Sequence, residues 1–312
     1  MRRLLATLIA CLSCQAWAAG SDYQLTPVAI AEGVYSFIGE LADFNPSNGG
    51  NIVNTGFIVG TEGVVVIDTG PSRRYGEQMR TAIARITPKP IALVINTHHH
   101  PDHFLGNQAF ADAPIGALAE TGKGIASEGD AFAENLFRMT GDWMSGTEVK
   151  APDQVLLAGP LKAGGRSLIL LALKGHTDAD LAVFDEDSAT LFAGDLVFNL
   201  RAPTTPHANI AQWKDALRDL DRFMKDHRVR VLVPGHGPIA RDALPIAWTR
   251  DWLTWLDKSL RESAAEGLDM NETLTLPLPD AYRDIPVSGS EYRRSVGHLF
   301  PAAEASSLQH SH

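Results

Sequence analysis

Apolar side chains recur along this chain with two different periods, which predicts both strands and helices. Short runs rich in Val, Ile and Leu, bounded by glycine or polar turn residues, predict strands. These runs cover residues 56–60, 64–68, 91–96, 167–173, 181–184, 190–193 and 229–233, and the first two form a hairpin. Apolar residues at helical spacing predict helices over 75–85 and 211–227, and a mostly helical stretch broken by glycines over 117–144.

The order of these elements predicts the fold class. Both halves of the chain pass from strands to a helix and back to a strand, and polar residues gather just after the strand ends. Two mixed β-sheets packed between helices are an economical way to bury such elements. We therefore expect an α/β (α+β) catalytic domain over residues 19–240, because no change in composition marks a linker inside it.

A C-terminal helical extension is expected over residues 241–312, packed on the same domain. One face of its first helix carries a stripe of large apolar residues, namely Trp248, Trp252, Trp255 and Leu256. We interpret the stripe as a packing face rather than an aromatic substrate site. The last residues, including His310 and His312, are expected to form a disordered tail.

The N-terminus has the pattern of a secretory signal peptide. Two arginines precede an apolar run over residues 4–14, and a small-residue cleavage motif follows at 16–18. We therefore predict a signal peptide over residues 1–18 and a periplasmic or secreted protein. Lipoprotein anchoring at Cys11 and an ordinary buried helix are the less favoured alternatives. No later segment reaches about 18 consecutive apolar residues, so no transmembrane segment is expected.

Composition and charge narrow the function. The chain of 312 residues is 45% hydrophobic and 21% charged, as in globular proteins, and its net charge is −10. This acidic balance argues against a nucleic-acid partner. Signal cleavage would leave 25 basic against 37 acidic side chains, a net charge of −12, and would remove Cys11 and Cys14, the only cysteines. A metal site in the exported protein must then use imidazole and carboxylate ligands.

A histidine-rich segment follows the predicted strand over residues 91–96. His98, His100, Asp102 and His103 form an HxHxDH motif. Residues two apart in an extended loop face the same side, so His98 and His100 can bind one ion together. Asp102 and His103 lie one step further, where the chain can turn toward a second ion.

Three more candidate ligands adjoin glycines later in the chain, namely His176, Asp195 and His236. Zinc favours imidazole and carboxylate, and two zinc ions can share a carboxylate. We assign His98, His100 and His176 to one Zn²⁺ and Asp102, His103 and His236 to the other, with Asp195 bridging them. His99 alternates away from its neighbours and is expected to support or pack against the site. Three remaining histidines are expected to be surface or hydrogen-bonded core residues, namely His207, His227 and His298.

The motif set resembles that of the metallo-β-lactamase-fold hydrolases. HxHxDH, the later ligands and the segment Val66-Ile67-Asp68-Thr69-Gly70 carry this resemblance over residues 30–240. It implies a four-layer αβ/βα sandwich with a dinuclear site at one edge of the two sheets. It also implies that Asp68 is a buried carboxylate holding the ligand loop, although a simple turn at a strand end fits Asp68 equally well. Asp195 matches the bridging aspartate of glyoxalase II-like enzymes, whereas common β-lactamases have cysteine there, so β-lactam hydrolysis is disfavoured as the main activity.

A narrower resemblance concerns the quinoprotein relay system zinc metallohydrolases. It rests on residues 33–35, 49–60 and 291–296. It implies a periplasmic partner, either a quinoprotein that uses pyrroloquinoline quinone or a c-type cytochrome.

These observations predict a hydrolase that acts on an ester, thioester, lactone or amide bond of a small molecule. Zinc-bound hydroxide would attack the carbonyl carbon, and Asp102 is the candidate for carrying a proton to the leaving group. Phe44, in a predicted mobile flap over residues 41–50, and Arg201 are candidate substrate contacts. For Arg201 we favour an ordinary surface residue over one that steers an anionic substrate.

Two other function classes remain open from the sequence. A mononuclear iron dioxygenase of the persulfide dioxygenase type would need only His98, His176 and Asp195. A non-catalytic metal-binding accessory protein of a quinoprotein would retain the ligands without turnover. Metal identity and count distinguish the first alternative, and a broad substrate screen distinguishes the second.

Overall fold

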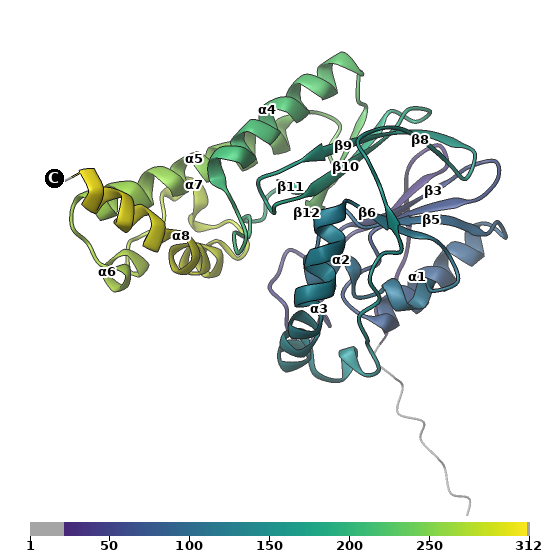
Figure 1. Ribbon diagram of the computed structural model, residues 1–312, viewed down its shortest axis with the longest axis horizontal. Coiled ribbons are helices and arrows are strands. Elements are labelled where there is room, and N and C mark those ends of the chain that lie inside the picture. The colour runs from purple at the N-terminus through teal and green to yellow at the C-terminus, as the bar shows by residue number, and fades with distance from the viewer. Residues whose placement is uncertain (1–21, 311–312) are drawn as a thin grey trace, which may run out of the picture.

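The structure, a computed structural model, describes residues 22–310 (Figure 1). The predicted signal peptide over residues 1–18, with Cys11 and Cys14, and His312 at the other end lie outside the described residues. Within residues 22–310, no helix combines the length and the apolar character that a membrane crossing requires.

One sheet contains seven strands in chain order. They are β1 (Val28–Ala31), β2 (Val34–Phe37), β3 (Thr55–Val59), β4 (Val64–Ile67), β5 (Ile91–Ile95), β6 (Ile115–Ala117) and β7 (Gln154–Val155). Strands β1 to β4 pair antiparallel and β4 to β7 pair parallel, so the sheet is mixed. The antiparallel pairing of β3 with β4 confirms the predicted hairpin.

The other sheet contains five strands in the order β12-β11-β10-β9-β8. Their bounds are β8 (Gly159–Ala163), β9 (Arg166–Leu173), β10 (Asp180–Asp185), β11 (Thr190–Phe198) and β12 (Val231–His236). Only β11 and β12 pair parallel, so this sheet is also mixed. Strand β11 continues past the predicted end at residue 193, because it stays paired with β12 through register irregularities on either side of Gly194.

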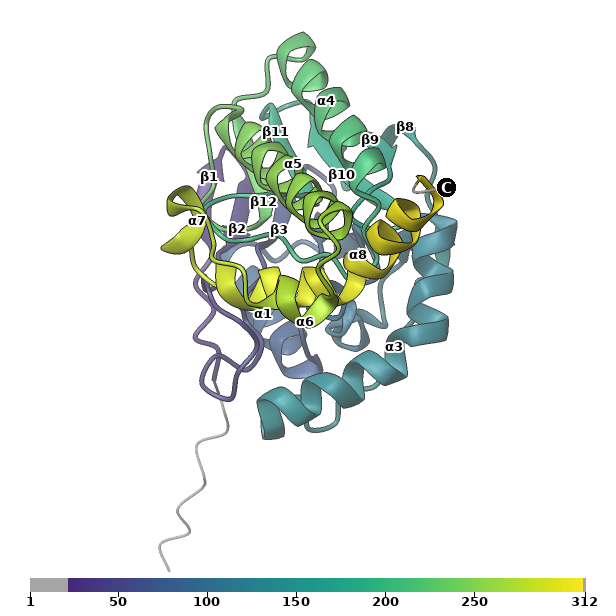
Figure 2. The same ribbon diagram turned by 90° about the vertical axis from the view of Figure 1, so that its left-hand side faces the viewer.

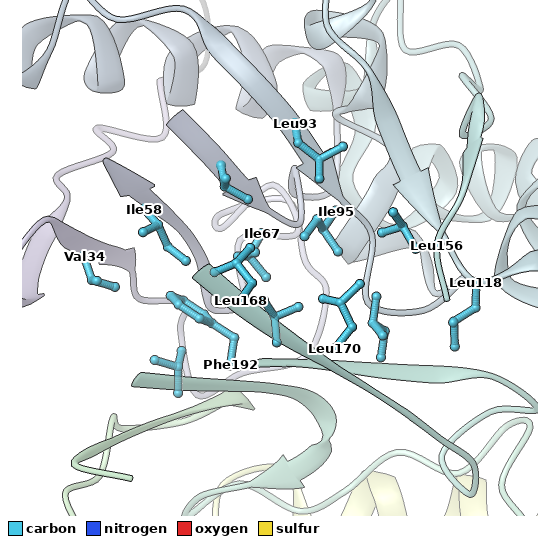
Figure 3. Packing of buried hydrophobic residues seen from close by; sticks show 14 of the residues in the cluster. Val34, Ile58, Ile67, Leu93, Ile95, Leu118, Leu156, Leu168, Leu170 and Phe192 are labelled. Atoms are coloured by element: carbon cyan, nitrogen blue, oxygen red, sulfur yellow. The ribbon is translucent and has the colours of Figure 1, made fainter. Parts of the chain in front are cut away.

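The two sheets pack face to face around a buried apolar layer (Figure 3). Side chains from the seven-stranded sheet, such as Ile58, Ile67 and Ile95, lie opposite Leu170 and Phe192 of the five-stranded sheet. Each of these side chains is at most 3% exposed. Fully burying a side chain of this size contributes about 1.5–3 kcal/mol, so this layer is a main source of stability.

Helices cover the outer faces of both sheets, which completes the predicted four-layer αβ/βα sandwich (Figure 1). Helix α1 (Arg73–Ile86) packs Met79 and Ile83 on the seven-stranded sheet. Helices α4 (Ile210–Asp226) and α5 (Leu244–Ala265) pack on the five-stranded sheet. The remaining helices are α2 (Pro101–Phe104), η1 (Asn107–Phe110), α3 (Ala119–Thr140), η2 (Gly141–Met144), α6 (Met270–Leu274), α7 (Asp280–Arg283) and α8 (Ser288–His310).

Helix α3 corrects part of the prediction of a helical stretch broken by glycines over 117–144: it runs without interruption over 22 residues, and a glycine, Gly141 with φ +67, ends it within that stretch. Two of its glycines lie where neighbours approach closely. A Cβ atom at Gly124 would lie 2.8 Å from His99 Cγ, and one at Gly129 would lie 2.8 Å from Val149 Cγ1. These glycines therefore serve close packing rather than helix termination.

The C-terminal helices pack on the main body and on each other. Trp252 of α5 is fully buried in one apolar cluster with Trp213 of α4, so the aromatic stripe is a packing face as predicted. Figure 2 shows α8 beside α5, where Tyr292 and Phe300 join Leu256 in a further buried cluster. Helix α8 extends to His310, which corrects the predicted disordered tail at that residue.

Candidate metal centre

The seven predicted ligand residues meet at one edge of the two sheets, and all seven are buried. His98 and His100 lie in the loop after β5, and Asp102 and His103 lie in the first turn of α2. His176 lies in the loop between β9 and β10, Asp195 lies inside β11, and His236 is the last residue of β12. Asp195 was expected just after a strand, but it lies inside the longer β11. Segments far apart in sequence therefore supply one compact group of imidazoles and carboxylates.

A first cluster contains His98, His100, His176 and Asp195, whose potential ligand atoms all lie within 4.8 Å of one another. His100 Nδ1 lies 2.8 Å from His176 Nε2. Asp195 Oδ2 lies 3.4 Å from His176 Nε2 and 3.9 Å from His98 Nε2. This is a donor set of three imidazoles and one carboxylate.

A second cluster contains Asp102, His103 and His236, again with potential ligand atoms within 4.8 Å of one another. His236 Nε2 lies 3.4 Å from Asp102 Oδ2 and 3.2 Å from Asp195 Oδ2. His103 Nε2 lies 3.1 Å from Asp195 Oδ1. Asp195 thus contacts histidines of both clusters and lies between them, in the place expected of a bridging carboxylate.

Outer hydrogen bonds fix the orientation of three of the rings. Ile52 O is 2.7 Å from His236 Nδ1, and a carbonyl oxygen can only accept, so the ring proton is on Nδ1. His103 Nδ1 donates to Asp68 Oδ2 over 2.8 Å. Thr97 Oγ1 donates to Asp68 and can accept from His98 Nδ1 at 3.1 Å. In the neutral ring, each arrangement leaves Nε2 with a free lone pair directed at the clusters, as metal ligation requires.

Asp68 holds the ligand loop from the end of β4. Besides His103, its carboxylate accepts hydrogen bonds from Thr97 N and Thr97 Oγ1, both at 2.8 Å. Its backbone has φ +57, a conformation that aspartate tolerates better than most residues. The two interpretations of Asp68, a turn residue and a holder of the loop, therefore apply together.

Asp180 performs a similar role for His176, and the sequence analysis missed it. Its carboxylate accepts hydrogen bonds from His176 N at 3.1 Å and Thr177 Oγ1 at 2.7 Å. Burial raises the pKa of Asp180 to about 7, although the hydrogen bonds from Thr177 oppose the shift. An aspartate four residues after a candidate ligand, at the start of a strand, is the signal that could have identified it.

Burial keeps three histidines neutral. Burial and the neighbouring imidazoles hold the pKa values of His98 and His100 well below 6.5. Burial also lowers the pKa of His176 to about 3. Burial also opposes the charged form of His103, but the carboxylates of Asp195, Asp102 and Asp68 outweigh it and raise this pKa well above 6.5. For Asp195 burial favours the neutral acid, yet His236 and His103 outweigh it and hold the pKa well below 3.8.

Gly235 allows β12 to approach Asp195. A Cβ atom at this position would collide with Asp195 Oδ1. Glycine, which has no Cβ atom, therefore permits the close approach of the backbone to this ligand.

A cavity of about 310 Å³ adjoins both clusters, and its lining includes His100, Asp102, Asp195 and His236. One wall is mainly apolar and includes Phe44, Phe132, Leu136 and Met139. Another is polar and includes Arg201, Glu291, Arg294 and His298, the last three from α8. A small molecule in this cavity would contact apolar and charged groups at once.

Arg201 is not the surface residue that we favoured from the sequence. It is 1% exposed, pairs with Glu291 at 3.4 Å and donates to Ala42 O. The chain turns at Leu200, which has φ +55 and is exposed, and this turn directs Arg201 inward. Burial raises the pKa of Glu291, although Arg201 and Arg294 oppose the shift.

The loop over residues 41–50 lies at the cavity and is tethered on two sides. Asp43 pairs with Arg294 of α8 and accepts a hydrogen bond from Ser290 at 2.7 Å. Trp143 Nε1, in η2, donates to Pro46 O at 2.9 Å. Phe44 therefore reaches the cavity wall from a loop held at both ends, and the predicted mobility of this flap stays a prediction.

Two histidines that we expected to be ordinary lie at the site. His207 Nδ1 is 2.9 Å from His100 Nε2, and His298 lines the cavity. His99 is buried beside Gly124 and contacts the His207 ring at a centroid distance of 4.9 Å, in keeping with the supporting role expected of it. His227 stacks on Phe223, as an ordinary histidine would.

The chain matches a family model described as the metallo-beta-lactamase superfamily over residues 48–236. A probable metallo-hydrolase of Methanocaldococcus jannaschii is 24% identical over 193 residues, which cover 60% of this chain and 88% of that protein. An acyl-coenzyme A thioesterase of Homo sapiens is 26% identical over 215 residues, covering 60% and 74% of the two chains. A solved metallo-beta-lactamase from Pontibacter korlensis is 23% identical to this chain and has a TM-score of 0.60. The match covers 74% of this chain and 99% of that one and shows the shared fold.

Proposed function

The chain belongs to the metallo-beta-lactamase superfamily, and from this membership we propose that it is a dinuclear zinc hydrolase acting on an ester, thioester, lactone or amide bond. One observation carries the proposal. Seven buried side chains direct nitrogen and oxygen lone pairs toward one place, while the outer nitrogens of His98, His103 and His236 are hydrogen-bonded away from it.

The donor set fits zinc. His98 Nε2 and His103 Nε2 are buried without a hydrogen-bond partner among residues 22–310. A buried polar atom left in this state costs about 1–3 kcal/mol, which a bound cation would offset. Imidazole and carboxylate are the donors that zinc accepts when no thiolate is present.

Each cluster would hold one ion. His98, His100 and His176 would bind the first, Asp102, His103 and His236 the second, and Asp195 would contact both. When bound, such a pair supplies a hydroxide near neutral pH and a Lewis acid for a carbonyl oxygen.

The side chains around the cavity would position the substrate and move its proton. Asp102 lines the cavity, where its carboxylate can take a proton from the reacting group and return it to the leaving group. Phe44, Phe132 and Met139 offer a water-excluding wall for an apolar part of the substrate. Arg294 is 45% exposed at its side chain and can contact a polar part.

Thioesters are the bond class that we would test first. Asp195 occupies the position at which common β-lactamases place a cysteine, so this chain lacks that ligand. The similar acyl-coenzyme A thioesterase supports hydrolysis of a thioester. An iron dioxygenase using His98, His176 and Asp195 would leave the buried second cluster without a role, so we prefer the dinuclear hydrolase.

We further propose that the protein is exported and acts with a quinoprotein or cytochrome in the periplasm. The signal-peptide pattern over residues 1–18 supports export, and the resemblance over residues 49–60 supports the partner. N-terminal sequencing of the protein recovered from a bacterial periplasm tests the export directly. A chain absent from the periplasm and found in the cytoplasm with Met1 retained would contradict it.

The hydrolase proposal is tested on the full chain with chromogenic esters, lactones and thioesters, before and after metal removal by a chelator. We expect hydrolysis that is lost on chelation and returns with Zn²⁺. His100→Ala should abolish activity and lower the metal content with the fold intact, whereas His227→Ala, a histidine away from the clusters, should change neither. Full activity in metal-free protein would refute the proposal.

A further inference from the structure

We propose that His207 and Glu128 orient the imidazole of His100, through a hydrogen bond between the two rings and a close contact of His207 with the Glu128 carboxylate, and thereby set the metal affinity of the first cluster. The inference rests on the proposed metal centre, because it concerns one of that centre's ligands. His207 lies in the loop between β11 and α4, and Glu128 lies on α3. Neither residue belongs to the HxHxDH motif or to the other predicted ligands.

The three side chains form a continuous line. His100 Nδ1 faces the first cluster, and His100 Nε2 lies 2.9 Å from His207 Nδ1. On the far side of the second ring, His207 Nε2 lies 3.3 Å from Glu128 Oε2. Both nitrogens of His207 are thus engaged.

Only one placement of the protons lets His100 bind a cation within this line. Ligation through Nδ1 requires a lone pair there, so the proton of His100 must be on Nε2. This N–H then donates to His207 Nδ1, which leaves the proton of His207 on Nε2, facing the Glu128 carboxylate. A carboxylate at the end of such a line orients the ligand ring and strengthens it as a donor.

Among residues 22–310, His100 Nε2 has no other hydrogen-bond partner than His207. His98, His103 and His236 are oriented by Thr97, Asp68 and Ile52 O, all from segments close to the site. His207 supplies the equivalent contact for His100 from the loop between β11 and α4, 107 positions away in sequence. The residues just before it, Thr204, Thr205 and Pro206, line the substrate cavity. The contacts of His207 therefore connect the loop that lines the cavity with the metal ligand His100 and with Glu128 of α3.

His207 and Glu128 lie at a separate recess of about 280 Å³. His99, Glu120, Lys123, Glu128 and His207 are among the residues that line it. Because His207 and Glu128 line this recess and not the substrate cavity, replacing either can test the line without changing a direct substrate contact.

The same residues raise the alternative of a further metal ion bound by His99, His207 and Glu128. His99 Nε2 lies 3.9 Å from Glu128 Oε1 and has no hydrogen-bond partner within the described part of the chain. A cation on His207 Nε2 would place the remaining proton of this ring on Nδ1. That proton would face the N–H of His100 across 2.9 Å, so ligation by His207 conflicts with ligation by His100. The arrangement in which His207 contacts both His100 and Glu128 is the one compatible with a metal on His100.

The experiment compares His207→Ala, His207→Asn, Glu128→Gln and the double variant His207→Ala/Glu128→Gln in the full chain. Glu120→Gln, an exposed carboxylate on the same helix, is the matched control. Affinity for Co²⁺ and Zn²⁺ is measured by competition with a chelator, together with the visible spectrum of the cobalt form and the number of ions per chain.

We expect His207→Ala to weaken metal binding by about 10–100-fold and to alter the cobalt spectrum. The amide oxygen of His207→Asn lies close to the position of Nδ1 and should restore most of the affinity. Glu128→Gln should weaken binding less than His207→Ala and should add nothing in the double variant, because its effect passes through His207. Glu120→Gln should match the wild-type protein.

Three results would overturn the inference while leaving the hydrolase proposal intact. They are wild-type affinity and spectrum in His207→Ala, additive losses in the double variant, and a third ion per wild-type chain that disappears in Glu128→Gln. A wild-type chain that binds no metal would instead refute the proposed function, and this inference with it.

Discussion

Histidine suits this site because each ring has two nitrogens, one that can bind a metal ion and one that can form a hydrogen bond with an outer partner. In His98, His103 and His236 one nitrogen is held by an outer partner, and the other points at the clusters. The sequence identified the inner ligands because they form a compact motif and adjoin glycines. It could not identify outer partners such as Ile52 O or His207, because a backbone carbonyl has no residue signature and a distant loop has no fixed spacing.

Asp68→Asn should lower the metal affinity by about 10–100-fold, because the charged acceptor for His103 is lost. Asparagine tolerates the positive φ of Asp68, so the turn itself should survive. Chelator competition measures the affinity, and circular dichroism checks the fold. Asp187→Asn, a carboxylate with a 55% exposed side chain, is the control. Unchanged affinity in Asp68→Asn would show that the carboxylate holds only the turn.

Secondary-structure elements were predicted well where local pattern determines them and less well where packing does. The β3–β4 hairpin and helix α4 follow from periodicity alone. The continuation of β11 to Phe198 depends on pairing with β12, and the continuity of α3 depends on what surrounds its glycines. Sequence periodicity reports neither of these tertiary contacts.

The glycines of α3 provide a matched pair of substitutions. A Cβ atom at Gly122 meets nothing within 4 Å, so Gly122→Ala should raise the free energy of unfolding by about 0.5–1 kcal/mol. At Gly124 the added Cβ would lie 2.8 Å from His99 Cγ, so Gly124→Ala should lose this gain and destabilise the protein. Urea unfolding of both variants measures the difference. Equal stabilisation by the two would contradict the close packing of α3 on His99.

Assembly of the whole molecule places α8 at the metal centre. Glu291, Arg294 and His298 line the cavity although they lie far beyond the histidine motifs in sequence. The sequence predicted a helical extension and its aromatic packing face, but not that a second helix of the extension forms a cavity wall. The helical pattern in the sequence shows which face of a helix is apolar. The position of α8 beside the cavity depends on its packing against α5, which the sequence pattern does not show.

The ion pair between Asp43 and Arg294 ties the cavity loop to α8 and should depend on pH. Burial would raise the pKa of Asp43, but Ser290 and Arg294 outweigh it and lower the pKa below 3.8. A lowered carboxyl pKa means that the stabilisation is present above the unfolded value and is lost as the pH falls through the folded one.

Asp43→Asn should therefore reduce the free energy of unfolding by about 0.5–1 kcal/mol at pH 7, a range typical of a partly exposed pair. The difference from the wild-type protein should shrink as the pH falls below about 4. Urea unfolding at pH 7, 5 and 3.5 measures both values. A difference that is constant over this range would show that the charge of Asp43 does not stabilise the fold.

The number of metal ions per chain tests the proposed centre most directly. The full chain is saturated with zinc, freed of excess metal and analysed by elemental mass spectrometry, alongside His98→Ala and His103→Ala, which remove one ligand from each cluster. We predict two zinc ions per wild-type chain and fewer than two in each variant. A wild-type chain that holds no ion, or a single iron and no second metal, would contradict the dinuclear hydrolase.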